Sequence, residues 1–139
     1  MELLTPGLRA VLLANGEVAA CGAGGSAHDP VPVVKFFNPV GAATWLVTEL
    51  DADGDTLFGL ADLGFGCPEL GSFSLSEIAA LRLRFGLRIE RDLSFKSDVP
   101  LSVWADAARH AGSISGAEAA MRESRRRGRS GPDELPSSN

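Results

Sequence analysis

Three aspartates at alternate positions, Asp51, Asp53 and Asp55, have the spacing in this chain that most resembles a chemical site. In an EF-hand, carboxylates at loop positions 1, 3 and 5 bind calcium, position 6 is glycine and position 12 is glutamate. Counted from Asp51, position 12 is Asp62, but position 6 is a threonine, and the flanking segments have the pattern of strands. The stretch is therefore predicted to be a hairpin turn, with a weak cation site at the three aspartates as the alternative.

Charged residues that interrupt apolar strand patterns form a second candidate site. Burial of a lone charge is costly, so each is predicted to be paired or to lie in water at a strand end. The simplest arrangement is an internal salt bridge of Arg91 with Asp62 or Glu49. The alternative is a polar cleft at one end of the sheet, formed by Glu49, Asp62, Glu69 and Arg91, that binds a ligand or a metal.

The cysteines and histidines do not form a recognisable catalytic pair. Cys67 lies in a glycine-rich segment, but cysteine catalysis needs a neighbouring base. No motif brings His28 or His110 close to Cys67. The thiol is expected to be inert, and neither a catalytic residue nor a cofactor is predicted.

Helix and strand signals predict the elements that position these residues. A helix is expected after Thr5, with Gly16 as its end, and a capping box at Ser74 starts another. Strands are predicted from short β-branched and aromatic runs and from alternation. In chain order the predicted elements are a helix over 6–15, strands over 31–37, 43–50 and 56–63, a helix over 74–85, a strand over 87–95 and a helix over 102–111.

The order α-β-β-β-α-β-α predicts an α+β fold with a small antiparallel sheet of about four strands and two to three packed helices. Short links between consecutive strands require antiparallel pairing. The first three strands are apolar on both faces, as covered central strands are. The helices need to cover only one face of the sheet, so the other face or an edge is expected to receive a partner.

Charge divides the chain into two parts. Residues 1–115 carry 8 Lys/Arg and 14 Asp/Glu, a net charge of −6, and are predicted to form one domain. Residues 116–139 carry 5 Arg and 4 Asp/Glu, a net charge of +1, and are predicted to be a disordered arginine-rich tail. Phosphate is repelled by an acidic body, so nucleic-acid binding is not expected of the folded part. No apolar run is long enough to cross a membrane and no signal peptide is recognisable, so a cytoplasmic protein is expected.

The phrases "PVVK", "ATWL", "FGLADLG", "PELG" and "ERDLSF" together resemble the bacterial domain-of-unknown-function family 2958. The resemblance covers about residues 3–114. It implies a small single-domain bacterial protein of the kind often encoded on plasmids or integrative elements. The family brings no established activity, so the resemblance assigns no role to any residue.

The leading hypothesis is a non-enzymatic interaction or regulatory accessory module, in a mobile-element context. Its partner is expected to be another protein, and an uncovered edge strand would favour a homodimer. The first alternative is a ligand- or metal-dependent enzyme built on the polar cleft. The second is a weak nucleic-acid binder that uses the arginine-rich tail. A DNA-mimicking inhibitor is a further possibility, for which −6 over 115 residues is a modest charge.

Overall fold

The computed structural model describes residues 2–22 and 28–134, with the backbone alone for residues 129–134. The strands are β1 (Val34–Phe37), β2 (Thr44–Leu50), β3 (Thr56–Asp62), β4 (Glu69–Ser74) and β5 (Glu90–Arg91). The helices are α1 (Pro6–Cys21), α2 (Leu75–Ala80), α3 (Leu101–Ala111) and α4 (Ile114–Glu134), with a 3-10 turn η2 (Arg84–Gly86). The fold is α+β, as the sequence predicts.

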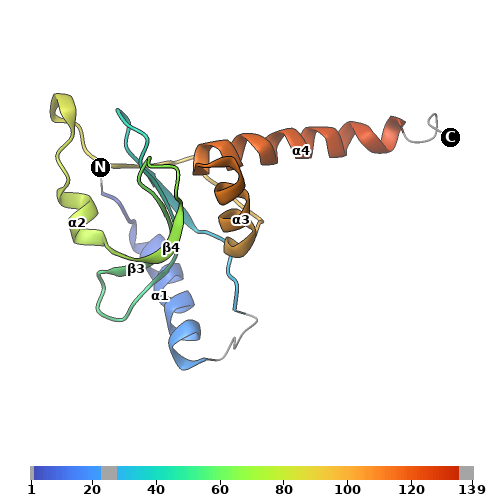
Figure 1. Cartoon of the computed structure of the whole chain (residues 1–139). Coiled ribbons are helices and arrows are strands. Elements are labelled where there is room, and N and C mark those ends of the chain that lie inside the picture. The colour runs from blue at the N-terminus through green and yellow to red at the C-terminus, as the bar shows by residue number, and fades with distance from the viewer. Residues whose placement is uncertain (1, 23–27, 135–139) are drawn as a thin grey trace.

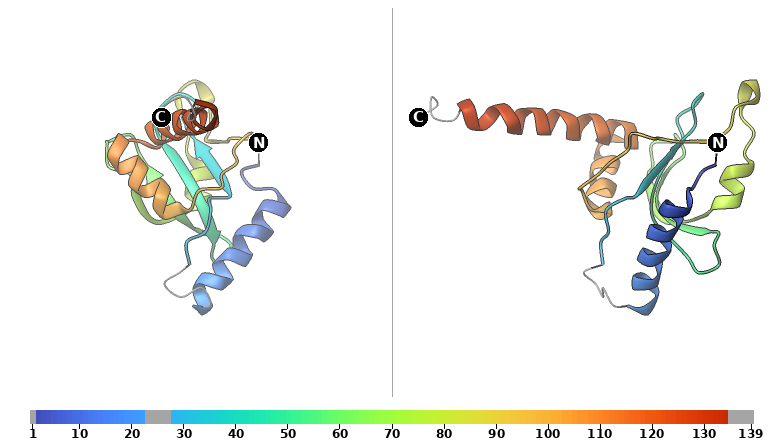
Figure 2. Two further views of the ribbon diagram at one scale, coloured as in Figure 1. Left: turned by 90° about the vertical axis from the view of Figure 1, so that its right-hand side faces the viewer. Right: turned by 180° about the vertical axis from the view of Figure 1, so that it is seen from behind.

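The five strands form one antiparallel sheet in the order β4-β3-β2-β1-β5. α1 and α2 lie on one face of this sheet, and α3 and the start of α4 lie on the other (Figure 1, Figure 2). Helices therefore cover both faces of the sheet, so the free face that the sequence allowed for a partner is occupied. The surface that the fold leaves open is an edge of the sheet.

Two hydrophobic clusters, one on each face, explain why both faces are covered. Side chains alternate along a strand, so β2 and β3, which carry apolar side chains on both faces, supply both clusters. The α1 side buries Leu12, Val34, Phe36, Trp45, Val47, Leu50 and Leu57, among others. The α3 side buries Leu46, Leu60, Leu101, Trp104, Ala105, Ala108, Ile114 and Ala117.

β2 and β3 form the predicted hairpin, with residues 51–55 as its loop. The pairing register shifts between Val47 and Glu49, which marks a β-bulge at Thr48. The Thr48 hydroxyl donates to the Phe58 carbonyl at 3.2 Å, and its carbonyl accepts from the Asn15 side chain at 2.9 Å. The bulge is thus fixed to both β3 and α1.

Three predicted elements differ from the structure around residues 65–95. The segment "GFGCPELGSF", predicted as a loop, contains β4. α2 begins directly after its predicted capping residue, Ser74, but ends at Ala80 rather than near residue 85. The strand predicted over 87–95 is reduced to the two residues of β5. The two edge strands and the short helix α2 differ, whereas the central strands agree.

The sequence predicts disorder for residues 116–139, whereas the structure continues α4 through Glu134. The buried Ala117 and partly buried Met121 extend the apolar face of Ile114 into this region. Five of the six residues 122–127 are good helix formers, and Glu123 pairs with Arg127 four residues later. The domain boundary predicted at residue 115 therefore falls inside a helix. Residues 135–139 lie outside the described part of the chain.

Within residues 2–22 and 28–134, no helix combines the length and the apolar character that a membrane span requires.

Candidate interaction surface

The four residues of the predicted polar cleft lie at separate places. Asp62 is opposite Thr44 at one end of the β2–β3 ladder, and Glu49 is five residues along β2, about 17 Å away at strand spacing. Glu69 and Arg91 are in β4 and β5, the two edges of the sheet, about 19 Å apart across five strands. The structure does not bring these four side chains together.

Arg91, Glu49 and Asp62 each contact a different group, so the predicted salt bridge of Arg91 with Asp62 or Glu49 is wrong. Arg91 Nη1 donates to the carbonyls of Glu2 and Leu3 at 2.9 and 2.7 Å. Glu49 Oε2 lies 3.1 Å from His28 Nε2. Arg91 therefore fixes the N-terminal segment against β5.

Asp62 is buried, with 2% of its surface exposed, and its carboxylate accepts from two backbone N–H groups. Oδ1 accepts from Gly64 and Oδ2 from Ile114, both at 2.9 Å. Ile114 is the first residue of α4, where the helix dipole favours a negative charge. The buried carboxylate joins β3 to the start of α4, which is a structural role.

The aspartate loop is held by its own hydrogen bonds. Asp53 Oδ1 accepts from the backbone N–H groups of Asp55 and Thr56 at 2.8 Å, and Oδ2 accepts from the Thr56 hydroxyl at 2.6 Å. Asp55 accepts from the Ser74 hydroxyl at 2.7 Å and from the backbone N–H of Ser76 at 2.8 Å. In the described residues, no group of three or more His, Cys, Asp or Glu has an arrangement that could hold a metal ion.

These contacts lower both pKa values. The hydrogen bond from the Thr56 hydroxyl is the largest cause for Asp53, and the one from the Ser74 hydroxyl is the largest for Asp55. Because Asp55 receives donors from β4 and α2, the loop also links the β2–β3 hairpin to the start of α2.

Acid is expected to weaken the fold through Asp53 and Asp55. Their folded-state pKa values lie below the ordinary value of 3.8, so their stabilisation is present above that pH and is lost as pH falls through the folded pKa. The double variant Asp53→Asn/Asp55→Asn should have a lower thermal midpoint than the wild type at about pH 6, and the two curves should approach each other as the pH falls below 3.8. Asp51→Asn in the same loop is the control. The Asp51 carboxylate accepts from the N–H of the adjacent Ala52, a contact that does not connect the loop to β4 or α2. Parallel curves for wild type and double variant would contradict this prediction.

Cys67 is exposed, and its thiol lies 3.6 Å from the Phe65 carbonyl, within the same loop. His28 is engaged with Glu49 on β2, and His110 is in the last turn of α3. The three residues therefore belong to different parts of the fold.

One edge of the sheet is β4, which pairs with β3 alone among the described strands. Leu75 N donates to Asp55 O at 2.9 Å, and these two residues continue the β3–β4 register, in which Gly59 is opposite Gly71. In an antiparallel ladder, hydrogen-bonded and non-hydrogen-bonded pairs alternate. The N–H and C=O groups of Leu70 and Ser72 therefore point away from β3. They are the groups with which another strand would pair.

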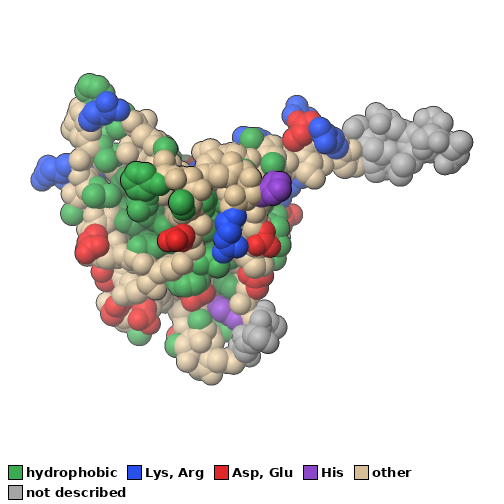
Figure 3. All heavy atoms as spheres, in the orientation of Figure 1, with side chains coloured by type: hydrophobic (Ala, Val, Ile, Leu, Met, Phe, Trp, Pro, Cys, Tyr) green, Lys and Arg blue, Asp and Glu red, His purple; other side chains and the backbone are tan. Residues whose placement is uncertain are grey.

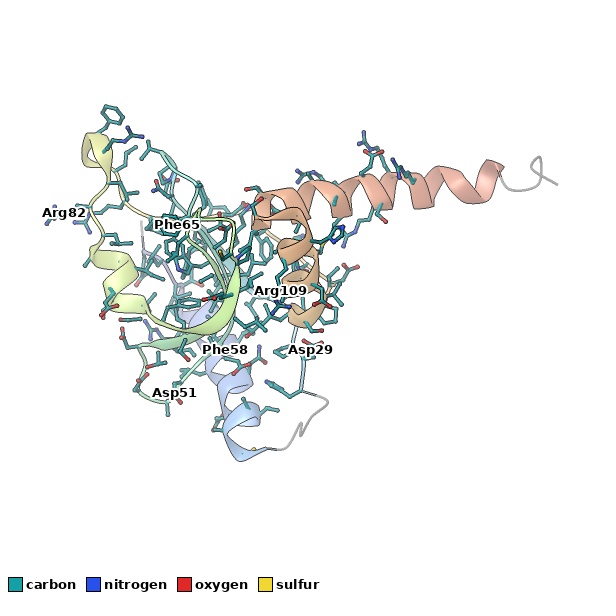
Figure 4. The ribbon with its side chains drawn as sticks, viewed as in Figure 1. Asp29, Asp51, Phe58, Phe65, Arg82 and Arg109 are labelled. Atoms are coloured by element: carbon teal, nitrogen blue, oxygen red, sulfur yellow. The ribbon has the colours of Figure 1, made fainter. Side chains whose placement is uncertain are left out.

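A hollow of about 620 Å³ lies beside this edge, on the α3 face of the sheet. Its apolar lining includes Phe58, Leu70 and Leu101, and its polar lining includes His28, Asp29 and Glu49. Figure 4 shows Phe58 next to β4 and Asp29 at the foot of α3, where its carboxylate accepts from the Ser102 backbone N–H at 3.0 Å.

The loop before β4 adds exposed apolar side chains. Phe65 is 82% exposed, Leu63 is 54% exposed and Leu70, in β4 itself, is 41% exposed. Figure 3 shows hydrophobic side chains gathered on the face that carries β4. The β4 edge, the hollow and residues 63–66 together are called the β4 surface below. Sequence reasoning missed this surface because it interpreted the glycines and proline of 64–71 as a loop.

A family model described as "Protein of unknown function (DUF2958)" matches residues 3–115. No curated protein and no solved structure matches the chain. The matched range includes all five strands and ends at the second residue of α4.

Proposed function

We propose that this chain, which belongs to the DUF2958 family of unknown function, is a non-enzymatic interaction module that binds an extended segment of another protein at the β4 surface. The observation that carries the proposal is the six-residue edge strand β4, whose outward backbone groups border an apolar hollow. A regulatory role as an accessory protein of a mobile element is part of the proposal and rests on the family resemblance alone.

Strand addition is the binding mode that this geometry supports. A partner strand would pair with the outward N–H and C=O groups of Leu70 and Ser72, which gives affinity without sequence preference. Leu70 is opposite Leu60, so it lies on the α3 face, where the hollow is. Every second side chain of the partner would point to that same face. An apolar side chain there would contact Phe58 and Leu70 in the hollow.

Charge adds a second preference. Asp29 and Glu49 line the hollow, and Glu69 is exposed at the start of β4. A partner segment with Lys or Arg beside its alternating apolar residues would complement these carboxylates.

An edge proline tests this mode. Ser72→Pro removes an outward N–H that does not pair with β3, so the fold should remain intact, because proline is tolerated on the free side of an edge strand. The probe is a displayed library of random 12-residue peptides, selected on the wild-type chain. Selected peptides should show apolar residues at every second position and bind Ser72→Pro at least tenfold more weakly. Ser72→Ala is the matched control and should bind like the wild type. Proline at Ser76 would not be an equivalent test, because the Ser76 N–H donates to Asp55 within the fold.

Amide hydrogen exchange adds a residue-level readout. Binding of a selected peptide should slow exchange at Leu70 and Ser72 and leave Gly71, whose groups face β3, unchanged. Peptides without alternation, or binding that survives Ser72→Pro, would overturn strand addition. If the wild type is a dimer and Ser72→Pro is a monomer, the strand that pairs with β4 would come from a second copy of this chain rather than from another protein.

The enzyme alternative has less support. It requires Glu49, Asp62, Glu69 and Arg91 around one cleft, whereas they lie at two ends and two edges of the sheet.

A further inference from the structure

We infer that the second half of α4 is an arm that binds the phosphate backbone of duplex nucleic acid. The first two turns of α4 are anchored in the α3-side cluster by Ile114 and Ala117, both fully buried, and by the partly buried Met121. The C-terminal part of α4 projects outward from the body (Figure 1, Figure 2), and Arg125 pairs with Asp98 of the body. Residues 122–134 are called the arm below.

Basic residues share one side of the arm. The positions Arg122, Arg125 and Arg126 recur at i, i+3 and i+4, which places them along one helical face. Residues 122–129 contain 5 Arg and 1 Glu, a net charge of +4, next to a body of −6. Figure 3 shows Lys and Arg along α4, and Asp and Glu on the lower part of the body. The acidic body repels a polyanion while the projecting arm attracts it, so binding is confined to the arm.

The ion pairs of the arm leave its arginines accessible to phosphate. The side chains of Arg125, Arg126 and Arg127 are 53, 74 and 78% exposed. Their carboxylate partners are also in solvent, since Asp98 is 83% and Glu123 46% exposed. Exposed pairs of this kind are weak in water, so phosphate oxygens can compete for the same guanidinium groups.

The composition of the arm favours nucleic acid over a protein groove. A helix that docks in a protein groove needs apolar anchors at i, i+3 and i+4. Residues 122–134 contain no Ala, Val, Leu, Ile or Met and no aromatic residue, so they offer no such anchors. All five basic residues of the arm are arginines, whose planar fork matches phosphate geometry. Unpaired bases are bound by stacking on aromatic side chains, which the arm lacks, so the phosphates of a duplex are the ligand. A helix about 10–12 Å wide also fits a major groove about 12 Å wide.

The test uses the full chain and a fluorescein-labelled 20-base-pair DNA duplex, with binding followed by anisotropy. Contacts to about four phosphates predict a roughly hundredfold loss of affinity between 50 and 200 mM NaCl. The triple variant Arg122→Gln/Arg125→Gln/Arg126→Gln should bind at least tenfold more weakly than wild type at 50 mM NaCl. The matched control, Arg82→Gln/Lys96→Gln/Arg109→Gln, removes the same charge from the body and should bind within about threefold of wild type. Glutamine keeps the helix propensity, and far-UV circular dichroism checks that both variants stay folded.

The outcomes separate the alternatives. No duplex binding at 50 mM NaCl, or equal losses in the triple variant and the control, would overturn the inference. Tighter binding to a single strand than to the duplex would overturn the choice of ligand. Binding to poly-glutamate but not to the duplex would assign the arm to an acidic protein. Ser72→Pro should leave duplex binding unchanged, so the arm and the β4 surface are tested independently.

Discussion

Gly59→Ala is expected to destabilise the protein more than any other single methyl addition on the central strands. A Cβ at Gly59 would lie 1.8 Å from the Leu46 carbonyl oxygen and 2.9 Å from its carbon. Both are backbone atoms of β2, so no change of side-chain rotamer relieves the contact. Gly59 pairs with Val47, directly before the bulge at Thr48. The two central strands would have to separate where each contributes to both hydrophobic clusters.

The expected loss is about 4 kcal/mol or more of unfolding free energy, in the range reserved for severe core changes. That is a large part of the roughly 5–15 kcal/mol that stabilises a typical domain. The thermal midpoint should fall by at least about 10 °C, measured by circular dichroism. An unfolded variant would equally agree with the prediction.

Gly71 supplies a matched control on the neighbouring strand. It is the register partner of Gly59, and a Cβ there would meet nothing within 4 Å. Gly71→Ala should change the unfolding free energy by no more than about 0.5 kcal/mol. Similar midpoints for the two variants would show that β2 yields at this point and would contradict the prediction.

Local sequence signals were sufficient to predict the helix starts and the central hairpin. Thr5 and Ser74 cap α1 and α2 as predicted, with the Thr5 hydroxyl oxygen accepting from Leu8 N at 3.2 Å. The hairpin of β2 and β3 also followed from nearby residues. The Asp53 carboxylate accepts hydrogen bonds from the backbone N–H groups two and three positions later and so stabilises the turn. In each case the residue and its partner lie within a few positions in the sequence.

Gly16 shows why some ends were misplaced. The sequence predicted it as the end of α1, but α1 continues to Cys21, and Gly22, with φ of 69°, takes the left-handed conformation. A Cβ at Gly16 would lie 2.2 Å from the Leu50 carbonyl oxygen. Gly16 is therefore required for close approach of α1 to β2. A single sequence does not distinguish a glycine that ends a helix from one that packs against a strand.

β4 was missed for a related reason. Gly71 and the preceding Pro68 are ordinary signs of a loop, and β4 has few buried side chains to give it a hydrophobic pattern. An edge strand has one neighbour only, so its sequence is less constrained than that of β2 or β3. The candidate site was missed with it, because the β4 surface exists only once β4 is paired with β3.

The reverse error occurred at residues 87–95, where alternation of apolar and charged residues predicted a full strand. The structure pairs only Glu90 and Arg91 with β1, and Leu93 is 72% exposed. Alternation therefore identified the position of a strand but not the number of its residues that pair with a neighbouring strand.

Asp62→Ala is expected to have the second-largest effect, through a contact that no local pattern reveals. Asp62 and Ile114 are 52 positions apart, and the carboxylate accepts the first N–H of α4 in a buried setting. Removal of the acceptor leaves that N–H without a partner in the core. Hydrogen bonds to a charged group contribute about 1.5–3 kcal/mol each, and Asp62 makes two. The expected loss is about 3–5 kcal/mol of unfolding free energy.

Asp62→Asn separates the charge from the shape of the side chain. Asparagine keeps one acceptor oxygen but places an amide donor against the second backbone N–H, so a loss of about 1–3 kcal/mol is expected. Asp106→Ala is the control, because that carboxylate is 83% exposed and pairs with Arg109 on the surface of α3, and it should cost less than about 1 kcal/mol. Hydrogen exchange should accelerate first at the start of α4, because Asp62 fixes that helix to β3. An Asp62→Ala midpoint within about 2 °C of the wild type would show that the carboxylate is dispensable to the fold, and its burial would then require a functional explanation.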